Sequence, residues 1–249
     1  MAMDMNRRRL FGVAGVAAAG AALAACSTDD KKDEATPTST SKTAPGPVHR
    51  PEIETPAQAR EELRKGNERY LNGEQVHPGT DEMRRVEVAL KQEPFAAILT
   101  CADSRVPVEI VTDQGFGDLF VVRVAGNVVG SSELGSLQYA VEHLHVPLIA
   151  VAGHAKCGAV DAAVGVADGG AMPGGAVDDI VNHILPAVRA AKNEVTPDQN
   201  LLTEAIKANA IQSRDIVLKD PLIAAEVSKG KLEVVAAYYD IDTGKFVVL

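Results

Sequence analysis

Residues 95–105 read FAAILTCADSR. The first six letters form a short apolar run without helical spacing, which is typical of a strand buried on both faces of a parallel sheet. Cys101 follows this run directly, and Asp103 and Arg105 lie on the same turn of chain. A cysteine in this place is consistent with packing, with a nucleophile or with a metal ligand, so its role depends on the rest of the chain.

Similar apolar segments recur along the chain and predict further buried strands at 119–124, 146–154 and 232–240, with a shorter one at 245–249. Helical patterns lie between them, and a charged amphipathic helix is expected after Thr55-Pro56, where proline fits the first helical position. Two or three helices are expected between residues 178 and 228, one of them bent or broken at Pro186. We therefore predict an α/β fold, with a mainly parallel central sheet flanked by helices and an N-terminal helical arm.

A second polar cluster, GHAKCGA, follows the predicted strand 146–154 and contains His154 and Cys157. Ligands bind outside the carboxyl ends of the strands in such sheets, so we expect Cys101 to meet these two side chains there. Two thiolates and one imidazole match zinc, and three protein ligands leave a fourth position, as in catalytic sites. Asp103 could ligate the metal or accept a hydrogen bond from its water, while Arg105 could hold that carboxylate through a bidentate pair.

Two simpler interpretations of the cysteines stay open. A cysteine after an apolar strand is often a packing residue. The first 25 residues predict an export signal, and two cysteines in an exported protein would ordinarily form a disulfide. Neither interpretation gives a role to Asp103, Arg105 or His154, so we favour the metal site.

The motifs CxDSR at 101–105 and HxxC at 154–157 together resemble the paired signature of the β-class carbonic anhydrases. The resemblance runs from about residue 52 to the end of the chain. It also covers three further stretches: FVVRVAGN (120–127), LQYAVEHL (137–144) and CGAV (157–160).

This resemblance implies reversible hydration of carbon dioxide to bicarbonate and a proton, by a zinc-bound hydroxide. One Zn²⁺ per subunit would be held by Cys101, His154 and Cys157, and Asp103 with Arg105 would form the dyad that orients the hydroxide. The implied substrate-binding residues are Gln92, Phe120, Tyr139 and Gly158. The pocket of the family lies at a dimer interface, so we expect a homodimer or tetramer in which some residues act across subunits.

One feature departs from part of the family. Some members carry a non-catalytic bicarbonate site that contains a tryptophan, but this chain has no tryptophan, and Ile98 stands where it would be expected. We therefore expect an enzyme without that switch, with an open metal site at neutral pH and with Gln92 placing it in the other subclass. Two alternatives are a related zinc hydrolase acting on carbonyl sulfide or carbon disulfide, and a non-enzymatic zinc-binding lipoprotein.

The first 25 residues predict an export signal, because three consecutive arginines precede an apolar run of small residues that ends before Cys26. RRRLF at 7–11 resembles a twin-arginine motif, and LAAC at 23–26 resembles a lipobox in which Cys26 is lipidated. Residues 26–50 predict a disordered tether and residues 51–249 the zinc domain. We expect an exported protein, anchored to the membrane by Cys26 on the extracytoplasmic side. A plain signal peptide with an incidental cysteine is the alternative.

The net charge of the chain argues against two kinds of partner. The chain carries a formal net charge of −9, which argues against a nucleic-acid surface and against electrostatic docking on anionic lipid.

Overall fold

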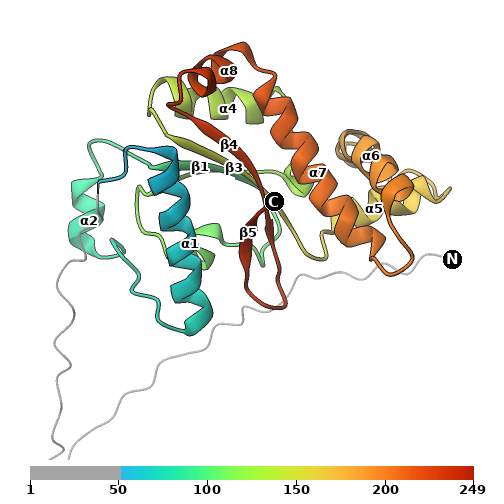
Figure 1. The fold of residues 1–249 in the computed structure, drawn as a ribbon, viewed down its shortest axis with the longest axis horizontal. Helices are drawn as coiled ribbons and strands as arrows, with labels where there is room; N and C mark the ends of the chain where they lie inside the picture. Colours follow the sequence, from blue (N-terminus) through green and yellow to red (C-terminus); the bar gives the residue numbers. More distant parts are fainter. Residues whose placement is uncertain (1–51) are drawn as a thin grey trace, which may run out of the picture. The chain divides into compact units, whose positions relative to one another are not determined.

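The computed structural model describes residues 52–249, so the predicted signal peptide, Cys26 and the tether lie outside the described residues. The described chain contains a five-stranded sheet in the order β2-β1-β3-β4-β5, with helices on both faces (Figure 1). The strands are β1 (Ala96–Thr100), β2 (Leu119–Arg123), β3 (Leu148–His154), β4 (Glu233–Tyr239) and β5 (Phe246–Val248). The first four are parallel and β5 runs antiparallel to β4, which confirms the predicted mainly parallel α/β fold.

The two central strands are buried on both faces. In β1, Ala96 and Ile98 belong to one apolar cluster, and Ala97 and Leu99 belong to another on the opposite face. This alternation follows from the period of two residues in a strand. It explains why the 95–100 run contains no polar side chain before Thr100.

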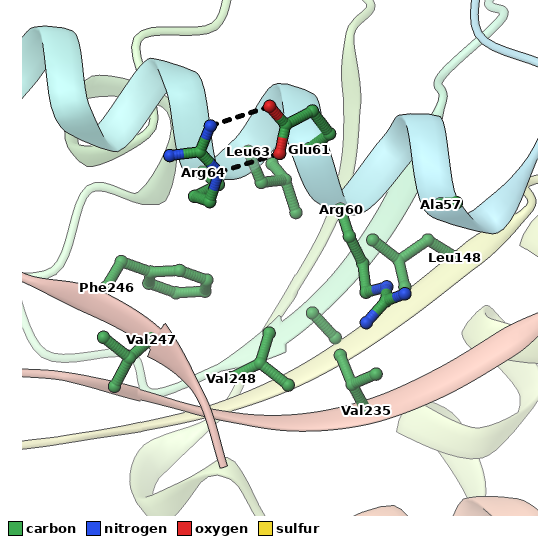
Figure 2. A pocket seen from close by; sticks show the side chains of 11 residues that line it. Ala57, Arg60, Glu61, Leu63, Arg64, Leu148, Val235, Phe246, Val247 and Val248 are labelled. Atoms are coloured by element: carbon green, nitrogen blue, oxygen red, sulfur yellow. Dashed lines mark hydrogen bonds and ion pairs between the residues drawn. The ribbon is translucent and has the colours of Figure 1, made fainter.

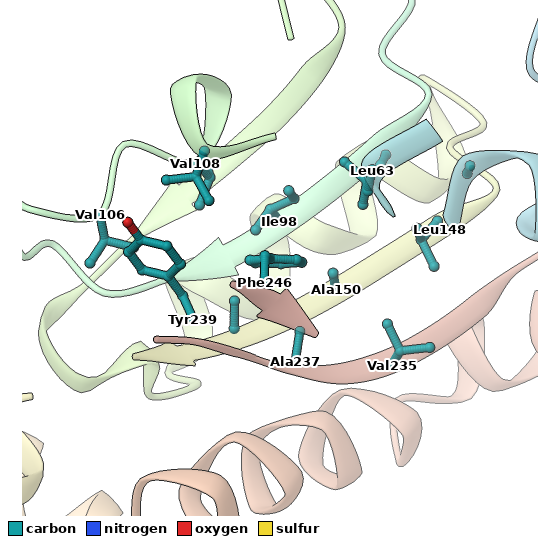
Figure 3. Packing of buried hydrophobic residues seen from close by; sticks show 14 of the residues in the cluster. Leu63, Ile98, Val106, Val108, Leu148, Ala150, Val235, Ala237, Tyr239 and Phe246 are labelled. Carbon is teal, nitrogen blue, oxygen red and sulfur yellow. The ribbon is translucent and has the colours of Figure 1, made fainter. Parts of the chain in front are cut away.

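Helix α1 (Pro56–Asn72) covers the first of these clusters. Its Leu63 packs among strand residues that include Ile98, Leu148 and Phe246 (Figure 3). Thr55 caps its first turn as expected, and Gln58 completes a capping box. The predicted N-terminal helix is therefore docked against the sheet of its own chain.

A buried amide fixes the far end of this helix. Asn67 donates hydrogen bonds to the carbonyls of Val111 and Gly244, at 3.0 and 2.9 Å, and its oxygen accepts one from the Phe246 amide at 2.9 Å. All the polar atoms of this buried side chain are thereby satisfied. One side chain thus ties α1 to the segment after β1 and to the C-terminal hairpin.

The opposite face and one end of the sheet are covered by the longer helices. They are α4 (Ser131–Glu142), α5 (Gly158–Ala167), α6 (Val177–Glu194), α7 (Leu201–Leu218) and α8 (Pro221–Ser228), with the short segments α2 (Glu82–Glu87), α3 (Val108–Val111) and η1 (Ala125–Asn127) elsewhere. Helix α6 is continuous through Pro186, so of the two predicted outcomes, a bend or a break, the break is excluded. Proline removes one backbone hydrogen bond, but Ile184, Leu185, Ala187 and Val188 around it are buried, and this packing stabilises the helix.

Within residues 52–249, no helix combines the length and apolar character that crossing a membrane requires.

Candidate metal centre

Cys101, His154 and Cys157 converge at the carboxyl edge of the sheet. The pairing of β1 with β3 places Thr100 opposite Ala152, so the chain leaves both strands at the same edge. One ligand atom from each of the three side chains lies within 4.8 Å of the others, and all three residues are buried. The structure thus brings together the three residues that the sequence predicts as ligands.

The His154 imidazole has the environment of a metal ligand. Its Nδ1 lies 2.9 Å from the Ala155 carbonyl, which fixes Nδ1 as the protonated nitrogen and leaves Nε2 as an acceptor. Nε2 is buried and has no hydrogen-bond partner among residues 52–249; an Asp103 oxygen is 3.9 Å away. An unpaired buried acceptor is costly, and a cation beside the two sulfurs would satisfy it.

The sulfur atoms of Cys101 and Cys157 are 3.9 Å apart, whereas a disulfide bond is about 2.05 Å long. Both thiols are therefore free. The contact with Cys157, followed in size by the neighbouring His154 ring and the Gly126 amide, lowers the pKa of Cys101 to about 4 against the opposing effect of burial. The same sulfur–sulfur contact and burial raise the pKa of Cys157, because a second negative charge beside the Cys101 thiolate is unfavourable. A divalent cation would stabilise both thiolates, and the nitrogen and sulfur donors fit zinc.

Asp103 and Arg105 form a close pair beside this cluster. The guanidinium donates to both carboxylate oxygens, from Nε to Oδ1 at 3.0 Å and from Nη2 to Oδ2 at 2.8 Å, and the Arg105 amide also donates to Oδ1 at 2.9 Å. These hydrogen bonds hold the pKa of Asp103 well below its usual range, so the carboxylate is ionised at neutral pH. Arg105 Nη2 also donates to the Lys156 carbonyl at 3.2 Å, which connects the two motifs.

Arg123 supports the turn that carries Cys101 and Asp103, a role that no sequence motif indicates. It lies at the end of β2, opposite Thr100, and its guanidinium donates to the carbonyls of Cys101 and Asp103 at 3.0 and 2.5 Å. These bonds fix the backbone of the ligand-bearing turn from the edge strand. Its signal in the sequence was its place at the end of a predicted strand, but a single basic residue is too common in such places to indicate this role.

The predicted substrate-binding residues divide into two groups. Gly158 begins α5 directly after Cys157 and so lies beside the metal ligands. Gln92 is exposed before the amino end of β1, whereas Cys101 follows its carboxyl end. The five residues of β1 between them span roughly 17 Å, so within one chain Gln92 is remote from the ligands.

Phe120 and Tyr139 lie together, also away from the candidate ligands. Their ring centroids are 6.1 Å apart, and Tyr139 is 44% exposed. Phe120 is paired with Ala97 near the start of β1, about 10 Å along the strand from the level of Thr100. The single chain therefore places these rings on the edge strand and on α4, and not beside Cys101.

A cavity of about 410 Å³ lies between α1 and the strands β3, β4 and β5 (Figure 2). Its wall is mainly apolar, and the two arginines at its rim are paired, Arg64 with Glu61 and Arg60 with Glu233. None of the three candidate ligands lines it. The cavity is thus separate from the cluster and offers no group to a reaction there.

Comparison with known proteins gives consistent matches. The family model described as carbonic anhydrase matches residues 96–246. Carbonic anhydrase 2 of Mycobacterium tuberculosis is 39% identical over 194 residues, covering 78% of this chain and 92% of that protein. A carbonic anhydrase of Pseudomonas aeruginosa is 34% identical over 166 residues, covering 64% of this chain and 74% of that protein.

Solved structures share the fold. A chain from the study of two tetrameric β-carbonic anhydrases of the fungus Sordaria macrospora matches with a TM-score of 0.62 and 23% identity, covering 78% of this chain and 94% of that chain. The Coccomyxa β-carbonic anhydrase in complex with acetazolamide matches with a TM-score of 0.56 and 24% identity, covering 76% and 84% of the two chains.

Replacing one ligand tests the metal site directly. We expect Cys157→Ser to weaken Zn²⁺ binding by more than the roughly 100-fold that loss of an outer-shell partner costs, because a thiolate ligand is removed. Competition with a chromophoric chelator would measure the affinity. His183→Gln, which removes a histidine outside the cluster, is the control and should bind normally; equal zinc affinity in Cys157→Ser and the wild type would contradict the assignment.

Proposed function

Because this chain belongs to the β-class carbonic anhydrase family, we propose that its buried Cys–His–Cys cluster binds one catalytic zinc ion and that the Asp103–Arg105 pair orients the water that reacts with carbon dioxide. The products are bicarbonate and a proton, and the reaction is reversible. The observation that carries the proposal is the ionised carboxylate held beside an otherwise buried ligand cluster.

The zinc ion and the Asp103 carboxylate have separate tasks in this reaction. Bound zinc supplies the Lewis acidity that activates a water molecule near neutral pH. Asp103 Oδ1 accepts two hydrogen bonds from Arg105, whereas Oδ2 accepts one, so Oδ2 keeps capacity for one more. Oδ2 is the oxygen that lies 3.9 Å from His154 Nε2. It is therefore placed to accept a hydrogen bond from the reacting water, which would direct a lone pair of the water oxygen toward carbon dioxide.

Arg105 has a second task in this proposal. The carboxylate of Asp103 is a competent zinc ligand, and coordination would fill the position that the reaction needs. Charge-assisted hydrogen bonds to both oxygens hold it instead on the arginine. Because the pKa of Asp103 is lowered, the pair is charged throughout the neutral and alkaline range, and the rate should show no titration of this group there.

The dyad is tested by Asp103→Asn. We expect this variant to keep its zinc but to lose at least about 100-fold in kcat for carbon dioxide hydration, because an amide presents a donor where an acceptor is needed. Stopped-flow measurement with a pH indicator from pH 7 to 9, with zinc content determined on the same samples, would show this. Asp242→Asn, which removes the partner of Lys156 on the surface, is the matched control. A normal rate for Asp103→Asn, or stoichiometric zinc in a wild-type protein that hydrates no carbon dioxide, would contradict the proposal.

We also propose that the working enzyme is a homodimer or a tetramer in which Gln92, Phe120 and Tyr139 of one subunit complete the pocket beside the zinc of another. The support is their distance from the ligands of their own chain, together with the partly exposed rings on the edge strand β2 and on α4. The Sordaria macrospora relatives with this fold are described as tetrameric.

Mixing two defective subunits tests this arrangement. Gln92→Leu and Asp103→Asn homodimers should each be slow, but a mixed dimer would contain one complete site. After subunit exchange we expect recovery to about a quarter of the wild-type rate, because about half of the dimers are mixed and each has one intact site. A mixture of Asp103→Asn with Arg105→Leu is the control, since both changes affect the same half of the site and no recovery is expected. If the first mixture recovers no more than this control, Gln92 does not act across subunits.

We propose that Cys26 is lipidated after removal of residues 1–25 and anchors the domain on the extracytoplasmic side, where the small uncharged substrate arrives by diffusion. We expect Cys26→Ser to move the protein from the membrane fraction to the soluble exported fraction, and Arg7→Lys with Arg8→Lys to reduce export. Fractionation with mass spectrometry of the N-terminal peptide would measure both effects. An unmodified Cys26, with equal fractionation of wild type and Cys26→Ser, would contradict the anchor.

A further inference from the structure

We infer that Asn209 of helix α7 is a positioning residue for the sulfur of Cys101, acting through the short turn η1. The inference rests on the zinc site proposed above and adds a residue that lies 108 positions from the ligand it serves. No sequence motif around Asn209 marks it; only the contacts in the folded chain do.

The contacts form a direct chain of three residues. The Gly126 amide donates to Cys101 Sγ at 3.2 Å, and the Gly126 carbonyl accepts a hydrogen bond from Asn209 Nδ2 at 2.8 Å. All three residues are buried, and Asn209 is only 1% exposed. The glycine that directs an N–H group at the ligand sulfur is therefore itself held by a side chain from α7.

Gly126 needs such external support because of its conformation. Its φ of 70° lies in the left-handed region, and the next residue, Asn127, also has a positive φ of 45°. A Cβ atom at Gly126 would approach Ile184 Cδ1 to 2.7 Å and Ala159 Cβ to 3.1 Å, so any other residue would displace these side chains in addition to straining the backbone. Glycine also has the widest conformational freedom, so the direction of its N–H group depends on contacts such as the one from Asn209.

Helix α7 is well placed to make this contact, because it packs closely against the sheet near the carboxyl end of β3. A Cβ atom at Gly153, the residue before His154, would lie 3.0 Å from Ile206 Cγ2 and 3.2 Å from the Ile206 carbonyl. Ile206 and Asn209 are three residues apart and thus on one face of the helix. The same helix face therefore meets the strand end that carries His154 and the turn that faces Cys101.

The inference predicts an altered metal–sulfur bond and not only a less stable protein. Asn209→Leu replaces the amide with an apolar side chain of similar size, so the Gly126 carbonyl loses its donor and the Gly126 amide is free to turn away from the sulfur. We expect the full-length variant to bind Zn²⁺ about 10- to 100-fold more weakly than wild type, as is typical for loss of an outer-shell partner. The Co²⁺-substituted protein should show a shifted thiolate-to-cobalt charge-transfer band.

Asn67→Leu is the matched control. Asn67 is also a buried asparagine that donates to backbone carbonyls, but within residues 52–249 its partners Val111 and Gly244 make no hydrogen bond to Cys101, His154 or Cys157. We expect it to lower the melting temperature while leaving zinc affinity and the cobalt spectrum of the folded protein unchanged. Spectra, chelator competition and thermal unfolding on the same samples would separate the two effects.

Three results would overturn the inference. The first is an Asn209→Leu protein with wild-type zinc affinity and cobalt spectrum. The second is a change of equal size in Asn67→Leu. If Asn209→Leu does not fold, Asn209→Ala takes its place in the comparison. The third result is that neither Asn209 variant folds while Asn67→Leu does, which would make Asn209 a determinant of folding instead. Loss of carbon dioxide hydration in a wild-type protein that binds zinc normally would refute the proposed function but not this role.

Discussion

The register between β1 and β3 is the constraint on which the site depends. Thr100 lies opposite Ala152, so the chain leaves β1 at Cys101 at the edge where His154 ends β3. A shift of one residue would turn every side chain of β1 to the other face of the sheet and carry Cys101 away from the imidazole. The apolar side chains on both faces make such a shift costly, since two separate clusters would lose their packing. Burial of the sheet interior thus fixes the geometry of the polar groups at its end.

The second constraint is electrostatic. Cys101, Cys157 and Asp103 bring three potential negative charges into a small and largely buried volume, and their repulsion must be offset. A divalent cation would offset the two thiolates, and Arg105 offsets the carboxylate through a bidentate pair. In the proposed mechanism, the pairing with Arg105 keeps the Asp103 carboxylate near the metal but not coordinated to it. Arg123 adds no further partner for the carboxylate, because its hydrogen bonds go to backbone carbonyls.

The sequence was sufficient for the elements whose signals are local. The apolar runs predicted the strands, and strand ends that carry Cys101 and His154 predicted the meeting of the ligands. Contacts between distant segments left no such signal: Asn209 reaches Gly126 from another helix, and its type and spacing are those of any polar residue on a helix. The break that Pro186 allowed is absent for the same reason, because the burial that keeps α6 continuous comes from tertiary packing and has no local signal in the sequence.

The separation of Gln92 from Cys101 bears on how a pocket for carbon dioxide can be built. An apolar, uncharged substrate needs an apolar wall beside the reacting water, yet within one chain Phe120 and Tyr139 lie on an edge strand and its covering helix, away from the ligands. An edge strand whose apolar side chains are only half-buried favours association with another chain. In the proposed assembly one contact therefore solves two problems, because it covers the exposed edge of one subunit and supplies the missing wall to the other.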